Sequence, residues 1–529
     1  MLGPVEREIM AQLFAAIPEE MGAVLVRSAR SPNIRERRDS AAALFAASGE
    51  LVAQAAHIPV HLGAMPEAVA AVRAEGARAG DVWVLNDPYT GGTHLPDITV
   101  IHAVGTAAQG HGGTGMIEPV AYAAVRAHHA DVGGVRPGSM PPGARTLAEE
   151  GVVIPPTCVG RGGALDEDAL DALVHGMREP AVRRADLAAQ IAAARLGGRR
   201  WSEMRWRHGA ERVDEAVRDL LEYAERRTRA ALTALREGEY VGEDVVEGDG
   251  ISDDPIVIRA RLVVEGGRLS VDFAGTAPAA AGNVNCPISV TRSAALFALR
   301  CLIPEDVPTN GGVARCVAVR APRGCLVNAE PPHAVAAGNM ETSQRIADLL
   351  LTLLREAGAD LPAQGQGTMN NVVFGTGDWV YYETLGGGQG ASAHGPGPSG
   401  VHVGMSNTRN TPIEVIEMEL PLRVEEYSIR RGSGGEGRGH GGTEALGHGR
   451  AHRGGDGVIR QIRVLAPCSL SLITERRRVA PKGAAGGGDA LPGRNLVNGR
   501  EVGSKAALDL SAGDVVRIET PGGGGFGGG

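Results

Sequence analysis

A polar loop at residues 86–97, with the sequence NDPYTGGTHLPD, constrains the fold of this chain more than any other segment. Short apolar runs at 82–85 and 98–101 flank the loop, and such runs are typical of buried strands. Between the runs lie Asp-Pro and Gly-Gly pairs, which mark turns. The chain is therefore expected to join two strand ends here, in the kind of loop where functional side chains are common.

His94 and Asp97 carry the chemistry of this loop. They place an imidazole and a carboxylate three residues apart, on either side of Pro96. A divalent metal binds nitrogen and oxygen donors of this kind at about 2.0–2.2 Å. A capped turn would use the same residues, so this spacing alone leaves both interpretations open.

Two further apolar runs, 41–45 and 120–125, also have ligand-type side chains near one end. Asp39 precedes the first run, and His128 follows the second. Side chains at neighbouring strand ends can meet in space, and two imidazoles with two carboxylates suit zinc, manganese or iron(II). The sequence therefore predicts a four-ligand metal site. Its ligands would be Asp39, His94, Asp97 and His128.

Four other residues near these runs are candidates for the same site. His129 and Asp131 follow His128 and are the predicted catalytic pair, which would orient the ligands through hydrogen bonds. The alternative for His129 is an exposed position, because adjacent residues on a strand point to opposite faces. His57 and His61 flank Pro59 and could line the site or simply pack near it.

A second group of polar residues lies among apolar neighbours in the C-terminal half. Asn370, Asn371, Asn407 and Arg409 are predicted to bind substrate or phosphate, because such side chains can hold an oxyanion. A structural role in tight turns is the alternative for the asparagines. The glycine-rich loop 386–390 could cradle an anion with backbone N–H groups or form a flexible turn.

Charge and motif content exclude several classes of function. The net charge of −9, with no basic block, argues against a nucleic-acid partner. The six cysteines contain no C-x-x-C pair, so neither a zinc knuckle nor a redox pair is indicated. Only Lys482 and Lys505 are present, and neither completes a P-loop. ATP, if the reaction uses it, is therefore expected to bind mainly elsewhere.

The N-terminus indicates where the protein works. Charged residues 6–8 stand where a signal peptide needs an apolar core, and no apolar run is judged long enough to cross a bilayer. A cytoplasmic protein with reduced thiols is expected.

Hydrophobic periodicity predicts a large α+β protein with a β-rich, glycine-rich C-terminal third. Pro18 is expected to kink or break the first helix. The long loop 137–162 is predicted to be functional, because it follows His128. Asn339 is expected to cap the helix that contains Glu341. Helices are predicted at 4–30, 64–75, 165–237, 288–303 and 341–356, and strands within 39–130, within 239–280 and beyond 360.

Three regions are expected. They are a metal-site α/β region at 1–164, a helical and mixed region at 165–358 and a β-rich region at 359–529.

Long blocks of the sequence resemble the B subunit of the hydantoinase B/oxoprolinase family. The resemblance covers nearly the whole chain, and blocks of this length are specific. One departure is the stretch between Asp97 and His128, which is lengthened by a glycine-rich segment at 109–115. A longer loop in a hairpin is easily tolerated. The matching blocks are 38–67, 86–97, 127–134, GNMETSQR at 338–345, QGTMNN at 366–371, NTRNTP at 407–412 and TPGGGGFG at 520–527.

The resemblance implies a metal-bearing subunit that works in a heteromer with a separate ATP-binding A subunit. The pair would hydrolyse the carbon–nitrogen bond of cyclic amides such as hydantoins, 5-oxoproline or lactams, after the A subunit phosphorylates the amide oxygen. The family's metal ligands fall on the four predicted ligands. Zinc is expected first, with manganese and iron as alternatives, and the metal would polarise the amide carbonyl or ready a water for attack.

Two alternatives to the hydrolase remain open from the sequence. Relatives in the family carboxylate ketones, so the chain could be a subunit of an acetone- or acetophenone-type carboxylase. It could also be a non-catalytic scaffold whose chemistry lies wholly in the partner. No nucleic-acid or membrane partner is expected in any of these cases.

Overall fold

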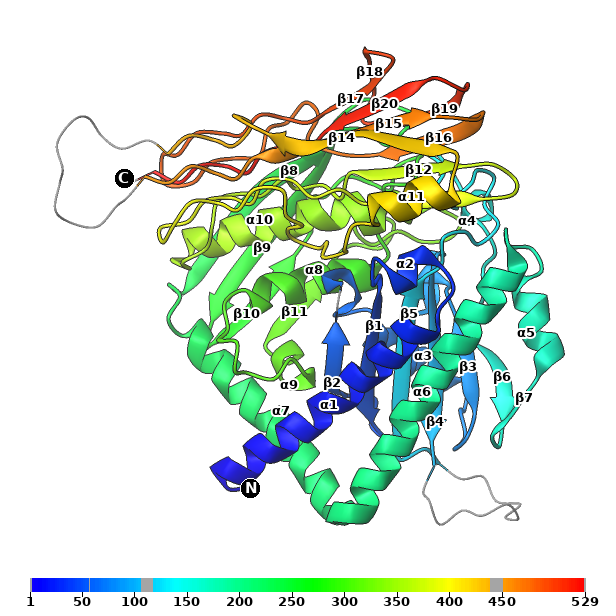
Figure 1. The fold of residues 1–529 in the computed structure, drawn as a ribbon. Coiled ribbons are helices and arrows are strands. Elements are labelled where there is room, and N and C mark those ends of the chain that lie inside the picture. The colour runs from blue at the N-terminus through cyan, green and yellow to red at the C-terminus, as the bar shows by residue number, and fades with distance from the viewer. Residues whose placement is uncertain (1, 57, 106–117, 438–450, 528–529) are drawn as a thin grey trace.

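The computed structural model describes residues 2–56, 58–105, 118–437 and 451–527 (Figure 1). Four sheets and the helices packed on them make the mixed α+β fold that the sequence predicts. Two of the sheets are each built from strands that are consecutive in the sequence. The strands of the other two sheets alternate along the C-terminal part of the chain. The division at residues 164 and 358 stays a prediction.

The N-terminal part forms a seven-stranded antiparallel sheet in the order β2-β1-β5-β4-β3-β6-β7. The apolar runs predicted as strands all lie in this sheet. Asp97 and His128 are register partners on β4 and β5, so the sheet itself brings two predicted ligands together. The strands are β1 (Ser40–Ala46), β2 (Leu51–Ala56), β3 (Val82–Leu85), β4 (Asp97–Val104), β5 (Ala121–His128), β6 (Thr157–Arg161) and β7 (Ala164–Leu165).

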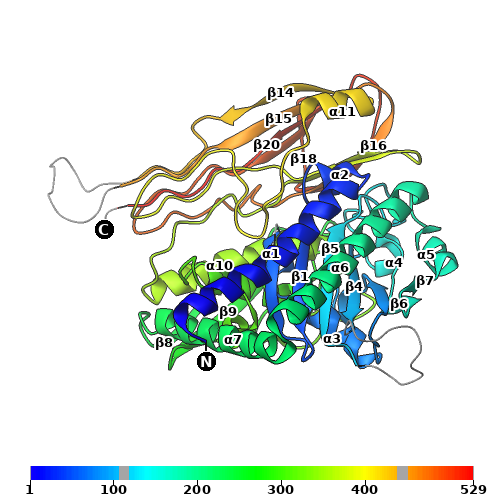
Figure 2. The same ribbon diagram turned by 60° about the horizontal axis from the view of Figure 1, so that its bottom comes forward.

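Helices cover both faces of this sheet, which explains why its central strands are apolar on both sides. α1 (Pro4–Ser28) and α6 (Pro180–His208) lie side by side across one face (Figures 1 and 2). α3 (Met65–Ala74) packs on the other face. Alternate residues of β1 enter the two cores: Leu44 faces α1 and α6, and Phe45 faces α3.

α1 corrects two expectations. Pro18 does not break it, because the helix is continuous from Pro4 to Ser28, while the kink stays a prediction. α1 also passes, by length and composition alone, a test for a helix that could cross a membrane, contrary to the expectation from the sequence. Buried core helices pass the same test, and α1 packs against β1, β2 and α6.

The predicted loop 137–162 contains regular structure. α4 (Leu147–Glu150) begins with a capping box in which Thr146 and Glu149 satisfy each other's backbone N–H groups. Two more helices, α5 (Glu167–Val174) and α7 (Ala210–Leu232), together with α6, confirm the predicted helical stretch from 165.

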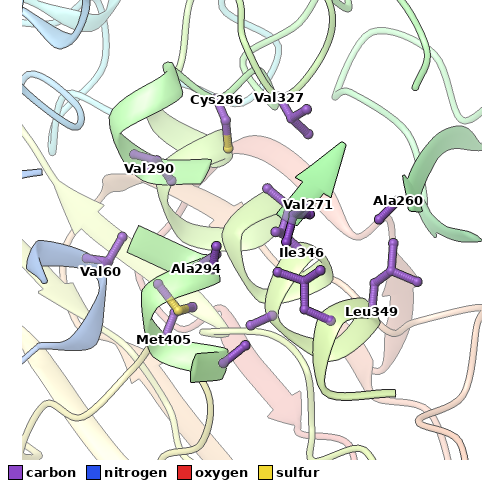
Figure 3. Packing of buried hydrophobic residues seen from close by; sticks show 14 of the residues in the cluster. Val60, Ala260, Val271, Cys286, Val290, Ala294, Val327, Ile346, Leu349 and Met405 are labelled. Carbon is purple, nitrogen blue, oxygen red and sulfur yellow. The ribbon is translucent and has the colours of Figure 1, made fainter. Parts of the chain in front are cut away.

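The middle part is a four-stranded sheet, in the order β11-β10-β9-β8, with helices packed against it. Its core, the largest in the molecule's described part, also receives Val60 from the N-terminal part and Met405 from the C-terminal part (Figure 3). This one cluster therefore contains residues from all three parts. The elements are β8 (Gly238–Val246), β9 (Ile256–Glu265), β10 (Arg268–Asp272), β11 (Val317–Arg320), α8 (Ile288–Arg300), α9 (Gly311–Ala314), the π-helical η3 (Gly338–Thr342) and α10 (Ser343–Glu356).

The C-terminal part contains two sheets, in the orders β13-β12-β16-β19 and β14-β15-β20-β17-β18, which pack on each other around a core of their own. In both views these strands form a layer over the rest of the chain (Figures 1 and 2). The strands are β12 (Asn371–Gly375), β13 (Val380–Glu383), β14 (Leu422–Arg430), β15 (Gly457–Val464), β16 (Cys468–Ile473), β17 (Arg494–Val497), β18 (Arg500–Val502), β19 (Lys505–Leu510) and β20 (Val515–Glu519); α11 (Ile413–Glu419) precedes β14.

Glycine-rich segments beside these sheets pack backbone against backbone. A Cβ on Gly388 would lie 2.0 Å from the carbonyl oxygen of Gly455 and 2.2 Å from the nitrogen of Gly523. The N–H of Gly388 donates to the carbonyl of Pro521. The loop 386–390 therefore serves packing, and the N–H groups of Gly387, Gly388 and Gln389 already donate to carbonyls, so they are not available to cradle an anion.

Candidate metal centre

Three of the predicted ligands meet where β4 and β5 lie side by side. Oδ1 of Asp97 lies 3.1 Å from Nε2 of His94 and 3.3 Å from Nδ1 of His128. One ligand atom from each residue lies within 4.8 Å of the others, and all three side chains are buried. His94 belongs to the loop that precedes β4, so the turn chemistry of residues 86–97 positions it. The predicted H-x-x-D pair does converge on one point.

His61 and Thr93 complete the surroundings of Asp97. Nε2 of His61, in the single turn η1 (Pro59–His61), lies 3.3 Å from Oδ2 of Asp97. The hydroxyl of Thr93 donates to the same oxygen at 2.6 Å. Both groups hold Oδ2, which leaves Oδ1 directed at the other two imidazoles. His61 thus lines the site, whereas His57 lies outside the described residues.

The electrostatics of the site show a carboxylate surrounded by imidazoles. Burial alone would raise the pKa of Asp97, but the charges of His94 and His61 and hydrogen bonds from His128 and His61 hold it well below its usual range. Burial lowers the pKa of His128, against the opposing effect of Asp97. An ionised carboxylate beside imidazoles is a donor set that a metal ion binds.

Several ring nitrogens in this site lack a hydrogen-bond partner among the described residues. They are both nitrogens of His94, Nε2 of His128 and Nδ1 of His61. Buried polar atoms are normally satisfied, so unpaired ones in a cluster of potential ligands need an explanation. A divalent cation would supply it, and the His94, Asp97 and His128 side chains have the donor types that zinc, manganese and iron(II) accept.

Asp39 lies next to this trio but outside it. Its carbonyl accepts the backbone N–H of His128 at 3.0 Å, so β1 places it beside the site. Its negative charge acts to raise the pKa of His128. Its carboxylate is not part of the group whose ligand atoms lie within 4.8 Å of one another. Asp39 therefore stays a predicted fourth ligand.

The predicted catalytic pair makes contacts outside the trio. Nε2 of His129 lies 2.8 Å from Oε1 of Gln190 on α6, and burial lowers the pKa of His129 to about 4. Asp131 accepts the backbone N–H groups of Gly133 and Gly138 and pairs with Arg178 at 2.9 Å. These contacts shape the turn after β5, and neither side chain joins the described ligand group.

The two asparagines at 370 and 371 have different surroundings. Asn370 donates to Gln366 and accepts from Arg477, far from the trio in the hydrogen-bond network. Asn371 accepts the hydroxyl of Tyr382 at 2.9 Å and donates to Glu341 at 2.8 Å. Because the ring of Tyr382 stacks on His128 with centroids 4.8 Å apart, Asn371 is connected to the trio through one aromatic side chain.

Glu341 lies within a helix, not at its capped start. The helical segment reaches back to Ala337, which takes the cap position of the π-helical turn η3, so Asn339 is not the cap. The π-helical turn runs on into α10 without a break. Burial, with the charge of Glu475, raises the pKa of Glu341 to about 7. π-helical turns are frequent at functional sites.

Asn407 and Arg409 are both exposed, and the backbone of Arg409 contacts a residue beside the site. Its N–H donates to the carbonyl of Arg37 at 3.0 Å. The guanidinium of Arg37 lies over the ring of Tyr382, 4.6 Å from its centroid. Their predicted role in binding substrate or phosphate stays a prediction.

Two residues of the site were not predicted from the sequence. Tyr382 packs against His128, and Glu150 accepts the N–H groups of Val335 and Ala336 beside His94. Burial raises the pKa of Glu150 to about 7. The only sequence signal for Glu150 is its place in the long loop after His128, and Tyr382 has no local signal beyond its strand.

Known proteins resemble this chain over nearly its whole length. The family model described as Hydantoinase B/oxoprolinase matches residues 3–528. "5-oxoprolinase 1" of Arabidopsis thaliana is 37% identical over 99% of this chain, which spans 42% of that protein's length. The B subunit of a putative D-/L-hydantoinase from Pseudomonas sp. (strain NS671) is 28% identical over 99% of this chain and 90% of its own.

A solved structure supports the fold. The ATP-dependent caprolactamase from Pseudomonas jessenii superposes with a TM-score of 0.86, covering 100% of this chain and 91% of that one. At 24% identity this likeness shows a shared fold. With the family model matching almost from end to end, the chain belongs to the Hydantoinase B/oxoprolinase family.

Proposed function

We propose that this chain is the metal-bearing subunit of an ATP-dependent cyclic amide hydrolase. The observation that carries the proposal is the buried trio His94, Asp97 and His128, with ring nitrogens that have no partner among the described residues. Membership of the family adds the class of reaction, because its relatives are named as 5-oxoprolinases and as a hydantoinase subunit.

A separate subunit supplies ATP in this proposal. The hydantoinase relative of similar length is named as one subunit of its enzyme, and this chain covers 90% of it. The 5-oxoprolinase relative is more than twice as long as the matched region, since this chain spans 42% of it. The present chain has no P-loop sequence. An ATP-binding partner of the A type, with which the chain forms a heteromer, fits these facts.

The residues at the centre have distinct roles in the proposed reaction. His94, Asp97 and His128 would hold a divalent ion, which when bound supplies Lewis-acid polarisation and lowers the pKa of a water. Nε2 of His61 lies 3.3 Å from Oδ2 of Asp97, so His61 holds that oxygen in place. Thr93 fixes the same oxygen, so the carboxylate cannot rotate away from the two imidazoles.

The walls of the site exclude water and limit what can enter. Tyr382 stacks on His128 on one side, and Arg37 covers the tyrosine ring. The two wall residues, Tyr382 and Arg37, and the three residues of the ligand trio are all buried. A charge that develops here is therefore poorly screened by solvent. The same environment strengthens each hydrogen bond offered to a reacting carbonyl oxygen.

Metal analysis tests the centre independently of turnover. We expect about one divalent ion per chain in the purified protein, and a large loss in His94→Ala. His394→Ala is the matched control, because His394 is exposed and pairs with Asp360 on the surface. Equal metal content in the wild type and in His94→Ala would refute the assignment of the ligands.

A substrate panel tests the reaction. The co-purified pair of subunits would be assayed for ADP and ring-opened product with hydantoins, 5-oxoproline and lactams, and with ketones plus bicarbonate. We expect ring opening with ADP formation by the pair, and none by this chain alone. Bicarbonate-dependent carboxylation would favour the carboxylase alternative, and turnover that survives complete loss of metal would favour the scaffold alternative.

A further inference from the structure

A pocket of about 340 Å³ lies beside β2, the strand at one edge of the N-terminal sheet. Residues from β2, from the start of α3, from α8 and from α9 line it, so segments far apart in the sequence enclose the space. No residue of the ligand trio lines it, and the pocket is therefore separate from the candidate metal centre. Its volume lies within the range of about 300–1,000 Å³ that is usual for small-molecule sites.

Apolar side chains from separate segments form most of the wall of this pocket. Such a wall favours a ligand with a hydrocarbon body, because the burial of apolar surface contributes about 25 cal/mol per Å². The apolar residues that line the pocket are Leu51, Leu62, Pro66, Leu296, Val313 and Ala314.

Gln54 brings a polar group to this apolar wall. It stands opposite Ala43 in the register of β1 and β2, and Ala43 packs in the core under α3, so both side chains lie on that face of the sheet. Nε2 and Oε1 of Gln54 are both buried and have no hydrogen-bond partner among the described residues. Buried polar atoms are normally paired, so a group that can both donate and accept is left unsatisfied at this pocket.

The charged side chains that line the pocket already have partners. Nε of Arg315 donates to Oε1 of Glu50 at 3.0 Å. Nη1 of Arg300 donates to the carbonyls of Ile303 and Pro304 at 2.9 and 3.1 Å, just beyond the end of α8. A charged ligand would have to compete with these contacts and would lose its own water, which is costly at an apolar wall. The pocket therefore favours a neutral ligand.

We propose that this pocket binds a neutral primary carboxamide with a hydrocarbon body. The ligand's carbonyl oxygen would accept from Nε2 of Gln54, and one of its amide N–H groups would donate to Oε1. Two amides that face each other in this way satisfy one donor and one acceptor on each side. A ligand with an acceptor alone would leave Oε1 of Gln54 unpaired. The site goes beyond the proposed function, because the ligand trio has no part in it.

The test measures binding to the full chain alone, without ATP or partner. Calorimetry would use benzamide as the carboxamide. N,N-dimethylbenzamide, which has no amide N–H, and benzoate, which is charged and has no donor, are the comparison probes. We expect saturable benzamide binding, with both comparison probes at least about 10-fold weaker, because each leaves the buried Oε1 of Gln54 unpaired.

Two variants separate the hydrogen bonds from the shape of the pocket. Gln54→Leu keeps the size of the side chain but removes its amide, so it should weaken benzamide binding at least about 10-fold and bring benzamide and N,N-dimethylbenzamide to similar affinities. Ala314→Leu narrows the apolar wall and should weaken the binding of both probes. It keeps the test decisive if Gln54→Leu does not fold, which its melting curve would show. Gln461→Leu, on β15 where the side chain donates to Glu425 outside the pocket, is the matched control and should leave benzamide binding unchanged.

Several results would overturn the inference. They are no saturable benzamide binding, equal binding of benzamide and N,N-dimethylbenzamide by the wild type, or unchanged benzamide binding in Gln54→Leu. Unchanged binding in Ala314→Leu would place the ligand elsewhere, and an equal loss in Gln461→Leu would show that the loss in Gln54→Leu is not specific to this pocket. Because the test uses neither turnover nor metal content, its failure leaves the proposed function standing.

Discussion

Two of the buried clusters of ionisable side chains among the described residues differ in their balance of charge. At the candidate metal centre, imidazoles surround the single carboxylate of Asp97, and several ring nitrogens have no partner among the described residues. In the second, here named the ion cluster, acids and bases neutralise one another. The ion cluster consists of Asp244, Arg345, Asp348, Glu475, Arg476 and Lys505.

The contacts of the ion cluster join two parts of the chain. Nη2 of Arg476 lies 2.8 Å from Oδ2 of Asp348 on α10 and 3.1 Å from Oδ2 of Asp244 on β8. Lys505, on β19, pairs with Glu475. The cluster therefore fastens the C-terminal sheets to the middle part of the molecule with paired charges.

The comparison shows which property separates a site from a structural network. Perturbed acids occur in the ion cluster too: burial raises the pKa of Asp348 to about 7. A shifted pKa is therefore no guide to function by itself. The difference lies in the balance of charge, since three acids face three bases in the ion cluster, whereas imidazoles surround one carboxylate at the metal centre.

The largest effect is expected from breaking the ion cluster. Arg476→Met would leave Asp244 and Asp348 buried without this partner, and the free energy of unfolding should fall by about 3–5 kcal/mol. Chemical denaturation measures this, with Arg494→Met, at a half-exposed position on β17, as the control. A loss below about 1 kcal/mol would mean that the cluster is solvated and does not fasten the two parts.

Asp97→Asn should damage turnover far more than folding. The amide keeps the shape and one acceptor oxygen but loses the charge that attracts a cation, so we expect at least about a 100-fold loss of turnover in the reconstituted pair. The melting temperature should fall by only a few degrees, which corresponds to a loss of roughly 1–2 kcal/mol in the free energy of unfolding.

A buried aspartate outside the site gives the matched control for this change. Asp81→Asn alters a residue that accepts a backbone N–H in a turn before β3, and its turnover should stay near that of the wild type. If Asp97→Asn retains both its metal and near-normal turnover, His94 and Asp97 are structural, and the comparison between the clusters fails.

The raised pKa of Glu341 should make the stability of the protein depend on pH. Its Oε1 accepts from Met369 and Asn371, while Oε2 has no partner among the described residues. Burial raises its pKa to about 7 from 4.5. The protonated form of Glu341 therefore stabilises the folded state. This contribution to the free energy of unfolding is fully present below pH 4.5 and is lost as pH rises through about 7.

Glu341→Gln imitates the protonated acid and should remove this share of the pH dependence. Between pH 5 and pH 8 the wild type should lose about 2 kcal/mol of unfolding free energy that the variant keeps. Denaturation at both pH values measures it, with Glu239→Gln, at an exposed position on β8, as the control. Parallel curves for the wild type and Glu341→Gln would show that this carboxylate is ionised throughout.

Local sequence patterns were enough to predict the strands and the ligand trio. The apolar runs and the turn residues of 86–97 are adjacent in the chain, and the register of β4 against β5 brings Asp97 opposite His128. The predicted helices at 64–75 and 288–303 were also confirmed, because their periodicity is local. Pro18 misled because the packing of α1 against the sheet outweighs one lost hydrogen bond.

Contacts between distant parts of the chain could not be predicted in this way. Tyr382 meets His128 only because the C-terminal sheets dock on the N-terminal part, and no periodicity encodes that docking. The glycine content indicated close backbone approach, but not which segments approach one another.

The smallest predicted effect concerns the hydroxyl of Tyr382, which connects the ring beside His128 to Asn371. Tyr382 donates to Oδ1 of Asn371 at 2.9 Å, and Asn371 in turn donates to Glu341. Tyr382→Phe removes this bond but keeps the ring on His128, so the unfolding free energy should fall by about 1 kcal/mol. Metal content should not change, because the ring and the ligand trio stay in place. Tyr240→Phe, which removes a hydroxyl bonded to the carbonyl of Arg236 at an exposed position, is the control. If Tyr382→Phe loses metal while Tyr240→Phe does not, the hydroxyl itself positions His128.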